Sequence, residues 1–132
     1  MADKNKQSIT ALLKKGEIVQ ANLKPDEKNC FHPIIFLEKI DDLQFIGCII
    51  SHDPNKGNIK MSINHFQNKD ENGKPYEIQY DDTYLVYKRY IKLAEWINKS
   101  IVAGKLTDEG ILFVENQTPK NIDYHPFPVW VK

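Results

Sequence analysis

Two long apolar runs in the first half of the chain predict buried β-strands. Residues 32–37 (HPIIFL) and 45–51 (FIGCIIS) are each almost continuously apolar, and a run of this length is typical of a strand buried on both faces. The acidic pair Asp41 and Asp42 lies between the runs and predicts a tight turn, so the two strands should form an antiparallel hairpin. Gly47, inside the second run, predicts a bulge or a tight bend.

Shorter segments on either side of this hairpin predict further strands. Their apolar and polar positions alternate, or they are rich in β-branched and aromatic residues. These segments are residues 16–23, 59–63, 76–80, 83–93 and 101–106. The pair Asn72-Gly73 predicts a hairpin turn before the strand at 76–80.

Two short helices are expected beside the strands. Residues 8–15 carry apolar side chains at helical spacing, and Gly16 would end that helix. Thr107 can cap a second helix near the C-terminus, with Asp108 and Glu109 at its positive end. Because short strands dominate and turn signals separate them, the predicted fold class is mainly β, a small β-barrel with short helices.

Length and composition predict one domain. A chain of 132 residues fits a single domain over 1–132, with residues 1–15 as an N-terminal extension and residues 118–132 as a C-terminal tail. The tail is rich in proline but carries the apolar segment 127–131, so it should pack on the body or on a partner.

The charge balance argues against a general attraction to nucleic acid or membrane. The 18 basic and 18 acidic residues cancel, and Arg89 is the single arginine. A protein that grips phosphates with forked guanidinium groups would usually carry more arginine. No segment approaches the roughly 18 apolar residues that span a bilayer, and the first residues lack the apolar stretch of a signal peptide. We therefore expect a cytoplasmic protein with no membrane segment, in which Cys30 and Cys48 stay reduced.

Titratable groups lie where the two long strands begin and end. His32 starts the first, and Ser51 and His52 end the second. A histidine with a pKa of about 6.5 can shuttle protons at neutral pH, and a serine hydroxyl can donate to an anionic oxygen. Each also has an ordinary interpretation, since histidine can cap a strand and Ser-His-Asp-Pro can form a turn. Three consecutive residues cannot form a Ser-His-Asp triad.

Two further sets of residues could have a function, namely the residues around Arg89 and the pair of histidines at 52 and 65. Arg89 stands among tyrosines and lysines, a pattern that can stack bases and hold phosphates but that also describes a half-exposed strand. His52 and His65 could serve a small metallohydrolase. Neither stands in a metal-binding motif, so no metal and no cofactor is predicted.

The order of these segments resembles the PemK/MazF family of bacterial toxin endoribonucleases. Gly16-Glu17-Ile18-Val19 is similar to the Gly-Asp/Glu-Ile-Val strand that opens that family's barrel, and His32-Pro33 holds the place of its Arg-Pro. The second apolar strand ends in Ser51, where the family has threonine or serine. The resemblance runs from about Lys15 to Glu115 and includes the strand-to-helix passage at 104–111.

The resemblance implies an SH3-like barrel that forms a homodimer, cleaves single-stranded RNA without a metal and is inhibited by an antitoxin protein. On this interpretation His32 is a general acid or base and Ser51 donates to the phosphate. His52, Lys24, Lys28 or Arg89 would supply positive charge. The departure from the family is His32, because an imidazole is not a permanent forked cation. The alternative is a non-catalytic β-barrel module that binds protein or nucleic acid and has lost the catalytic arginine.

Overall fold

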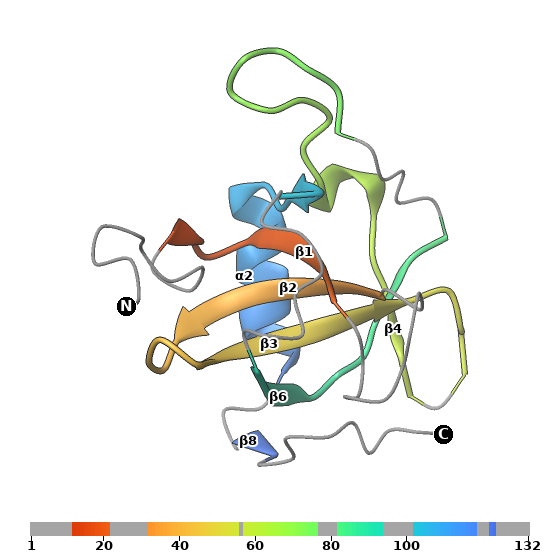
Figure 1. Ribbon diagram of the computed structural model, residues 1–132. Helices are drawn as coiled ribbons and strands as arrows, with labels where there is room; N and C mark the ends of the chain where they lie inside the picture. Colours follow the sequence, from red (N-terminus) through yellow and green to blue (C-terminus); the bar gives the residue numbers. More distant parts are fainter. Residues whose placement is uncertain are drawn as a thin grey trace, which may run out of the picture.

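One long antiparallel hairpin organises the sheet (Figure 1), as the two apolar runs predict. In the computed structural model, which describes residues 12–21, 32–55, 57–76, 82–93, 102–118 and 122–123, strand β2 (His32–Lys39) pairs with strand β3 (Gln44–Ser51). A carboxylate oxygen of Asp41 accepts hydrogen bonds from the backbone N–H groups of Leu43 and Gln44. This Asx-type turn confirms the predicted hairpin and its turn.

The hairpin bends at a bulge opposite Gly47. Phe36 pairs with Gly47 but Glu38 pairs with Ile46, so Leu37 is the extra residue. A Cβ atom at Gly47 would lie 2.8 Å from Cγ2 of Ile34 and 2.9 Å from the carbonyl oxygen of Ile35. The bulge predicted at Gly47 therefore lies in the partner strand β2, and Gly47 allows the two strands to approach closely.

Six strands pair in the antiparallel order β4-β5-β3-β2-β1-β7. Besides the hairpin these are β1 (Glu17–Ala21), β4 (Ile59–Lys60), β5 (Tyr84–Leu85) and β7 (Gly104–Lys105). Strand β6 (Arg89–Leu93) pairs with the first half of β3 while β5 pairs with its end. The strand predicted over 83–93 is thus split in two, because the sheet bends between these two pairings.

A short strand in the C-terminal tail adds to the sheet. Strand β8 (Ile122–Asp123) pairs in parallel with β6. The tail therefore contacts the body at these two residues, as predicted for this part of the chain. The aromatic segment 127–131 lies outside the described residues, as do residues 8–11 of the helix predicted over 8–15 and most of the strand predicted over 76–80. Of the described part of that predicted helix, residues 13–15 are not helical.

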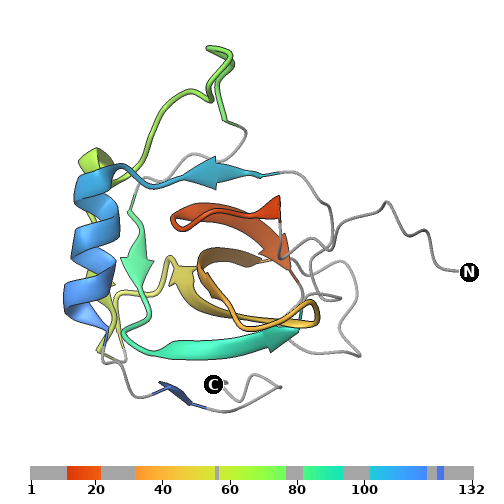
Figure 2. The ribbon, with the colours of Figure 1, turned by 90° about the vertical axis from the view of Figure 1, so that its left-hand side faces the viewer.

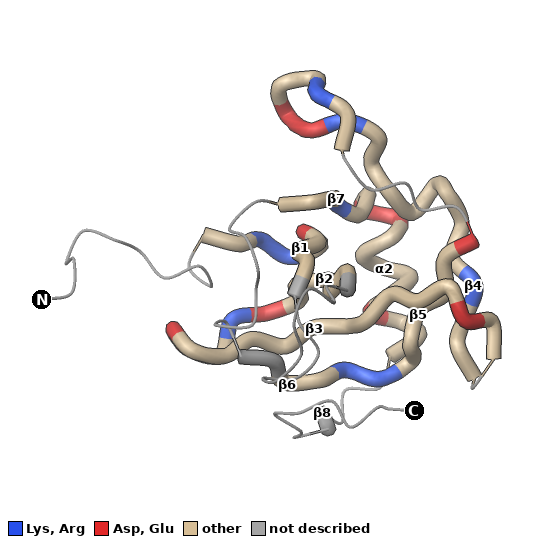
Figure 3. The backbone as a smooth tube through the Cα atoms, turned by 45° about the vertical axis from the view of Figure 1, so that its right-hand side comes forward, with Lys and Arg blue, Asp and Glu red and all other residues tan. Residues whose placement is uncertain are grey.

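The sheet curls until its two ends meet. After β4 the chain enters the short 3-10 helix η1 (Ile63–His65), and the next residue, Phe66, forms a β-bridge with Leu106 just beyond β7. The backbone N–H of Gln67 also donates to the carbonyl oxygen of Lys105 at 2.8 Å. Figures 2 and 3 show this curl from two sides, with helix α2 beside it. The predicted fold class, a mainly β barrel with a helix near the C-terminus, is confirmed.

Helix α2 (Asp108–Gln117) begins where the sequence predicts. The Thr107 hydroxyl accepts a hydrogen bond from the backbone N–H of Gly110 at 3.1 Å, and Asp108 and Glu109 occupy the first turn. Gly110 and Val114 are its buried residues. This buried side of the helix packs against η1 and the sheet.

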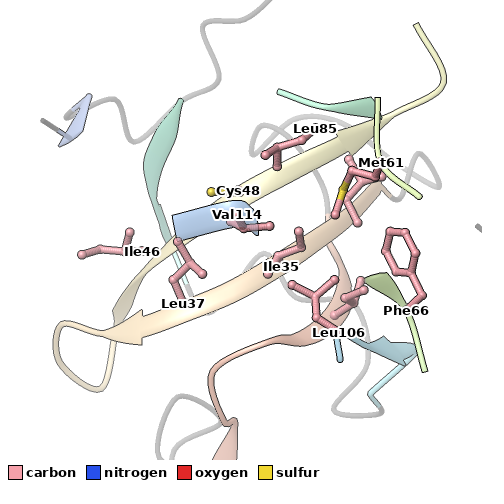
Figure 4. Packing of buried hydrophobic residues seen from close by; sticks show 11 residues of the cluster. Ile35, Leu37, Ile46, Cys48, Met61, Phe66, Leu85, Leu106 and Val114 are labelled. Carbon is pink, nitrogen blue, oxygen red and sulfur yellow. The ribbon is translucent and has the colours of Figure 1, made fainter. Parts of the chain in front are cut away.

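Alternating residues of the central strands feed two apolar clusters. Along β3, Cys48 and Ile50 belong to the cluster that contains Val114 of α2, whereas Phe45 and Ile49 belong to the second. Figure 4 shows the first cluster, in which residues from the hairpin, β5 and α2 converge. The second includes Leu13, so part of the predicted N-terminal extension belongs to the core. Among the described residues, no helix is both long and apolar enough to cross a membrane.

Candidate functional site

The two residues predicted to be catalytic occupy adjacent strands at the same end of the hairpin. His32 is the first residue of β2 and Ser51 is the last residue of β3. The register pairs Ile34 with Ile49 and Ile35 with Cys48. Because antiparallel partners change by one residue on each strand, continuing this register by two residues sets position 32 opposite position 51. The observed pairs end at Ile34 and Ile49, two residues short of these positions, and His32 and Ser51 are paired instead with Ala21 of β1 and Tyr84 of β5.

Ser51 is half-buried, and its hydroxyl organises the turn that follows β3. The Oγ atom accepts a hydrogen bond from the backbone N–H of Asp53 at 2.9 Å. This bond uses a lone pair of the oxygen, so the hydroxyl hydrogen stays available for donation to another acceptor. The turn interpretation and the functional interpretation of Ser51 are therefore compatible.

His52 is exposed beside Ser51, and its ring contacts the backbone of Asp82, two residues before β5. Its Nδ1 atom lies 3.1 Å from the carbonyl oxygen of Asp82. A carbonyl oxygen can only accept, so the proton of the neutral ring is on Nδ1 and the acceptor nitrogen is Nε2. The Asp82 backbone has a positive φ of 50°, a conformation that aspartate tolerates better than most residues.

A row of polar side chains extends from Ser51 across two more strands. Ser51 pairs with Tyr84 of β5, and Tyr84 pairs with Lys60 of β4. The Lys60 ammonium lies 5.3 Å from the centre of the Tyr84 ring and 3.2 Å from a carboxylate oxygen of Asp82. The hydrogen bond with Asp82, followed by the interaction with Tyr84, raises the pKa of Lys60. A hydroxyl, a phenol and a protonated amine therefore stand in line on one surface.

Sequence reasoning missed Lys60 and Tyr84 as site residues. The two are more than twenty positions apart in the chain, and each sits in a strand of only two residues. The alternation of Ile59 with Lys60 could have indicated that Lys60 faces solvent. Only the strand pairing reveals that it shares a row with Ser51.

Arg89 lies on the other face of the sheet. Its Nε atom donates to the Thr118 hydroxyl at 2.9 Å, and that hydroxyl donates to the carbonyl oxygen of Val114 at 2.7 Å. This is the α2 face, which Cys48 also shares, whereas strand alternation puts Ser51 on the opposite face. Arg89 and Ser51 are therefore not brought together, and Lys24 and Lys28 lie outside the described residues.

A polar pocket next to Arg89 has a volume of about 450 Å³. Within it, Lys15 forms an ion pair with Glu115 at 2.7 Å. Its lining residues are Lys15, Leu37, Glu38, Arg89, Glu115 and Asn116. Two carboxylates balance the two cations, so the pocket has no net attraction for an anionic substrate.

His65 has a structural role. The residue is buried, its Nδ1 atom accepts a hydrogen bond from the backbone N–H of Ser62 at 3.0 Å, and its ring stacks on Phe113 with 4.3 Å between ring centres. The ring thus caps η1 and anchors it to α2. Within the described parts of the chain, no group of three or more His, Cys, Asp or Glu residues is placed to hold a metal ion.

Cys48 is a free, buried thiol on the α2 face. Burial raises the pKa of Cys48 to about 12, although the Arg89 charge and a hydrogen bond with Thr118 oppose this rise. A thiol with such a pKa is protonated at neutral pH and is a poor nucleophile. A scan against protein-family models and a search of curated proteins found no match for this chain.

Proposed function

We propose that this protein is a PemK/MazF-like endoribonuclease that cleaves single-stranded RNA without a metal ion. The observation that carries the proposal is the β2–β3 register, which pairs Ile34 with Ile49 and, if continued by two residues, would set position 32 opposite Ser51. A proton-transfer group and a hydroxyl donor on adjacent strands suit an attack on a phosphodiester. The curled barrel and its C-terminal helix support the resemblance on which the proposal also rests.

In the proposed reaction the RNA 2′-hydroxyl attacks the adjacent phosphorus, and the bond from phosphorus to the 5′-oxygen breaks. A general base removes the 2′-hydroxyl proton and a general acid protonates the leaving oxygen. His32 performs one of these transfers. The Ser51 hydroxyl donates to a non-bridging phosphate oxygen, where negative charge accumulates in the transition state. A cation near Ser51 adds to this stabilisation.

Cleavage of a labelled single-stranded RNA pool in the presence of a metal chelator tests the proposal. His32→Ala should lower the rate by about 100-fold or more, the usual contribution of a proton-transfer group. Ser51→Ala should lower it by roughly 100-fold, since one donor to the charged oxygen is lost. Ser51→Thr keeps the hydroxyl and is the matched control, with activity close to wild type. Equal rates in all four folded proteins would contradict the proposal.

The proposal includes the assembly and location that the resemblance implies. The protein would act in the cytoplasm, form a homodimer and be inhibited by an antitoxin protein. Sedimentation equilibrium tests the dimer directly, because it distinguishes a particle with the mass of one chain, 15.4 kDa, from a particle of twice that mass. A single species of one chain mass at micromolar concentration would contradict this part.

A non-catalytic binding module is the second candidate. It is favoured by the position of Arg89, the single arginine, which is bonded to Thr118 on the α2 face rather than beside Ser51. Such a module would bind RNA or a protein with no turnover. The aromatic segment 127–131 would then dock the partner, and a chain ending at residue 123 should bind more weakly. Unchanged binding of that shorter chain would exclude this role of the tail.

A further inference from the structure

We propose that Lys60 is the phosphate-binding cation of this site and that it contacts the backbone of a single-stranded RNA lying across Ser51 and Tyr84. The inference rests on the proposed function for its class of ligand. It adds a binding residue that lies outside the resemblance to the PemK/MazF family. It also assigns Tyr84 as the residue that positions the Lys60 side chain.

The strand pairing sets the position of Lys60 relative to Ser51. Tyr84 is paired with Ser51 on one side and with Lys60 on the other. Adjacent strands are about 4.8 Å apart, so the backbones at Ser51 and Lys60 are about 10 Å apart. The Lys60 ammonium lies 5.3 Å from the centre of the Tyr84 ring. Its charge is therefore held at the side chain of Tyr84, the residue of the row that lies between Lys60 and Ser51.

The present partner of Lys60 is one that a phosphate can replace. The side chains of Lys60 and Asp82 are 58% and 84% exposed, and their contact is 3.2 Å long. An ion pair as exposed as this is weak, because water screens both charges, so a phosphate oxygen can compete for the ammonium. The Tyr84 ring contributes a cation–π contact that keeps the ammonium in place when the partner changes.

Arg89 and Lys39 are less well placed. Arg89 is on the α2 face, bonded to Thr118. Lys39 is ion-paired with Asp42 at 3.2 Å, at the turn end of the hairpin and so at the opposite end of β3 from Ser51. Figure 3 shows the basic segment of β4 well separated from that turn. Lys60 is therefore the described lysine that shares a strand row with Ser51.

The test measures binding separately from cleavage. The ligand is a fluorescent single-stranded RNA whose 2′-hydroxyls are replaced by 2′-O-methyl groups, which removes the nucleophile. Its dissociation constant is measured by anisotropy between about 50 and 200 mM salt, the range over which phosphate contacts weaken strongly. The proteins are wild type, Lys60→Ala, Lys60→Arg, Tyr84→Ala and Lys39→Ala. Lys39→Ala is the matched control, because it also removes a lysine from an exposed ion pair of 3.2 Å.

Lys60→Ala should weaken binding about fivefold to tenfold at low salt and reduce the slope of log K against log salt by about 0.7, the value for one phosphate contact in a single strand. Lys60→Arg should keep both the affinity and the slope. Tyr84→Ala should weaken binding by a smaller factor because the lysine loses its support. Lys39→Ala should match wild type. Loss of affinity in Lys60→Ala that is equalled in Lys39→Ala, or no loss in either, would overturn the inference.

The two proposals fail in different ways. If Lys60→Ala loses affinity for the 2′-O-methyl RNA while wild type cleaves no unmodified RNA, the Lys60 contact stands and the nuclease proposal falls. If wild type cleaves RNA and Lys60→Ala binds and cleaves equally well, the nuclease stands and the Lys60 contact falls. If wild type binds no single-stranded RNA at all, both are overturned.

Discussion

Arg89 and Thr118 are joined by a hydrogen bond of 2.9 Å from the guanidinium Nε to the hydroxyl Oγ1, which ties strand β6 to the residue that follows helix α2. The same hydroxyl donates to the carbonyl oxygen of Val114 in the last turns of the helix. The single arginine of the chain thus fastens a helix end to the sheet. The proposed phosphate contact on the face that carries Ser51 would have to come from another cation.

A double-mutant cycle between Arg89 and Thr118 should reveal this coupling. Thr118→Val removes a buried hydroxyl and should lower the free energy of unfolding by about 1–2 kcal/mol. Arg89→Met keeps the length of the side chain but removes its donors. The double variant should be less destabilised than the sum of the two by about 1 kcal/mol. Urea denaturation measures all four proteins, and strictly additive effects would show that the bond contributes nothing.

The Cys48 thiol should be inert in the folded protein. Burial raises the pKa of Cys48 to about 12, and the thiolate is the form that reacts with disulfide reagents. In a Cys30→Ser background, which leaves one thiol, a colorimetric disulfide reagent at pH 8 should detect no thiol until denaturant is added. Rapid reaction of one thiol in the native protein would contradict the burial of Cys48.

The same pKa shift predicts a loss of stability at high pH. The pKa of Cys48 rises from 9.0 to about 12 on folding. The contribution of the protonated thiol to the free energy of unfolding is therefore complete below pH 9 and is lost as the pH rises towards 12. Over that interval the unfolded state binds fewer protons, and the free energy of unfolding falls by up to about 1.4 kcal/mol per pH unit. The Cys48→Ala variant has no thiol at this position and therefore lacks this pH dependence. Urea denaturation from pH 8 to 10.5 should therefore give wild type the steeper decline, and equal declines would contradict the assignment.

Gly110 is expected to tolerate no side chain. A Cβ atom at this position would overlap the backbone carbonyl oxygen of His65, although alanine favours a helix over glycine by about 1 kcal/mol. Because the obstacle is backbone, the helix has to move away from η1, and Gly110→Ala should destabilise by about 1–3 kcal/mol. Thermal denaturation checks this, with Glu109→Ala on the exposed side of the same turn as the control. A higher melting temperature in Gly110→Ala would show that α2 can shift without loss.

Asp82→Asn should strengthen RNA binding. Removing the carboxylate that is 3.2 Å from Lys60 leaves the ammonium without its competing anion, and asparagine also accepts the positive φ at this position. Anisotropy with the 2′-O-methyl RNA should show an affinity higher by only about twofold to threefold, because an exposed ion pair is screened by water and is weak. Asp42→Asn, in the Lys39 ion pair, is the control and should leave affinity unchanged. A lower affinity in Asp82→Asn would mean that Asp82 positions Lys60 instead of competing for it.

The parts of the fold that depend on neighbouring residues were predictable. Continuous apolar runs indicate the hairpin, Asp41 bonds to the N–H groups two and three residues ahead, and Thr107 caps a helix within its own turn. These features follow from backbone sterics and short-range hydrogen bonds, which a linear sequence displays directly.

The composition of the site depended on pairings between distant segments. The sequence marks His32 and Ser51 as strand ends. The register of the strands decides which strands are adjacent, where the bulge at Leu37 falls and which face each residue occupies. A shift of one residue exchanges the two faces of a strand. For that reason the sequence alone could determine a barrel with titratable groups at its strand ends. Only the tertiary structure could separate Arg89 from Ser51 and bring Lys60 and Tyr84 into line with it, because cross-strand neighbours are selected by the packing of the whole sheet.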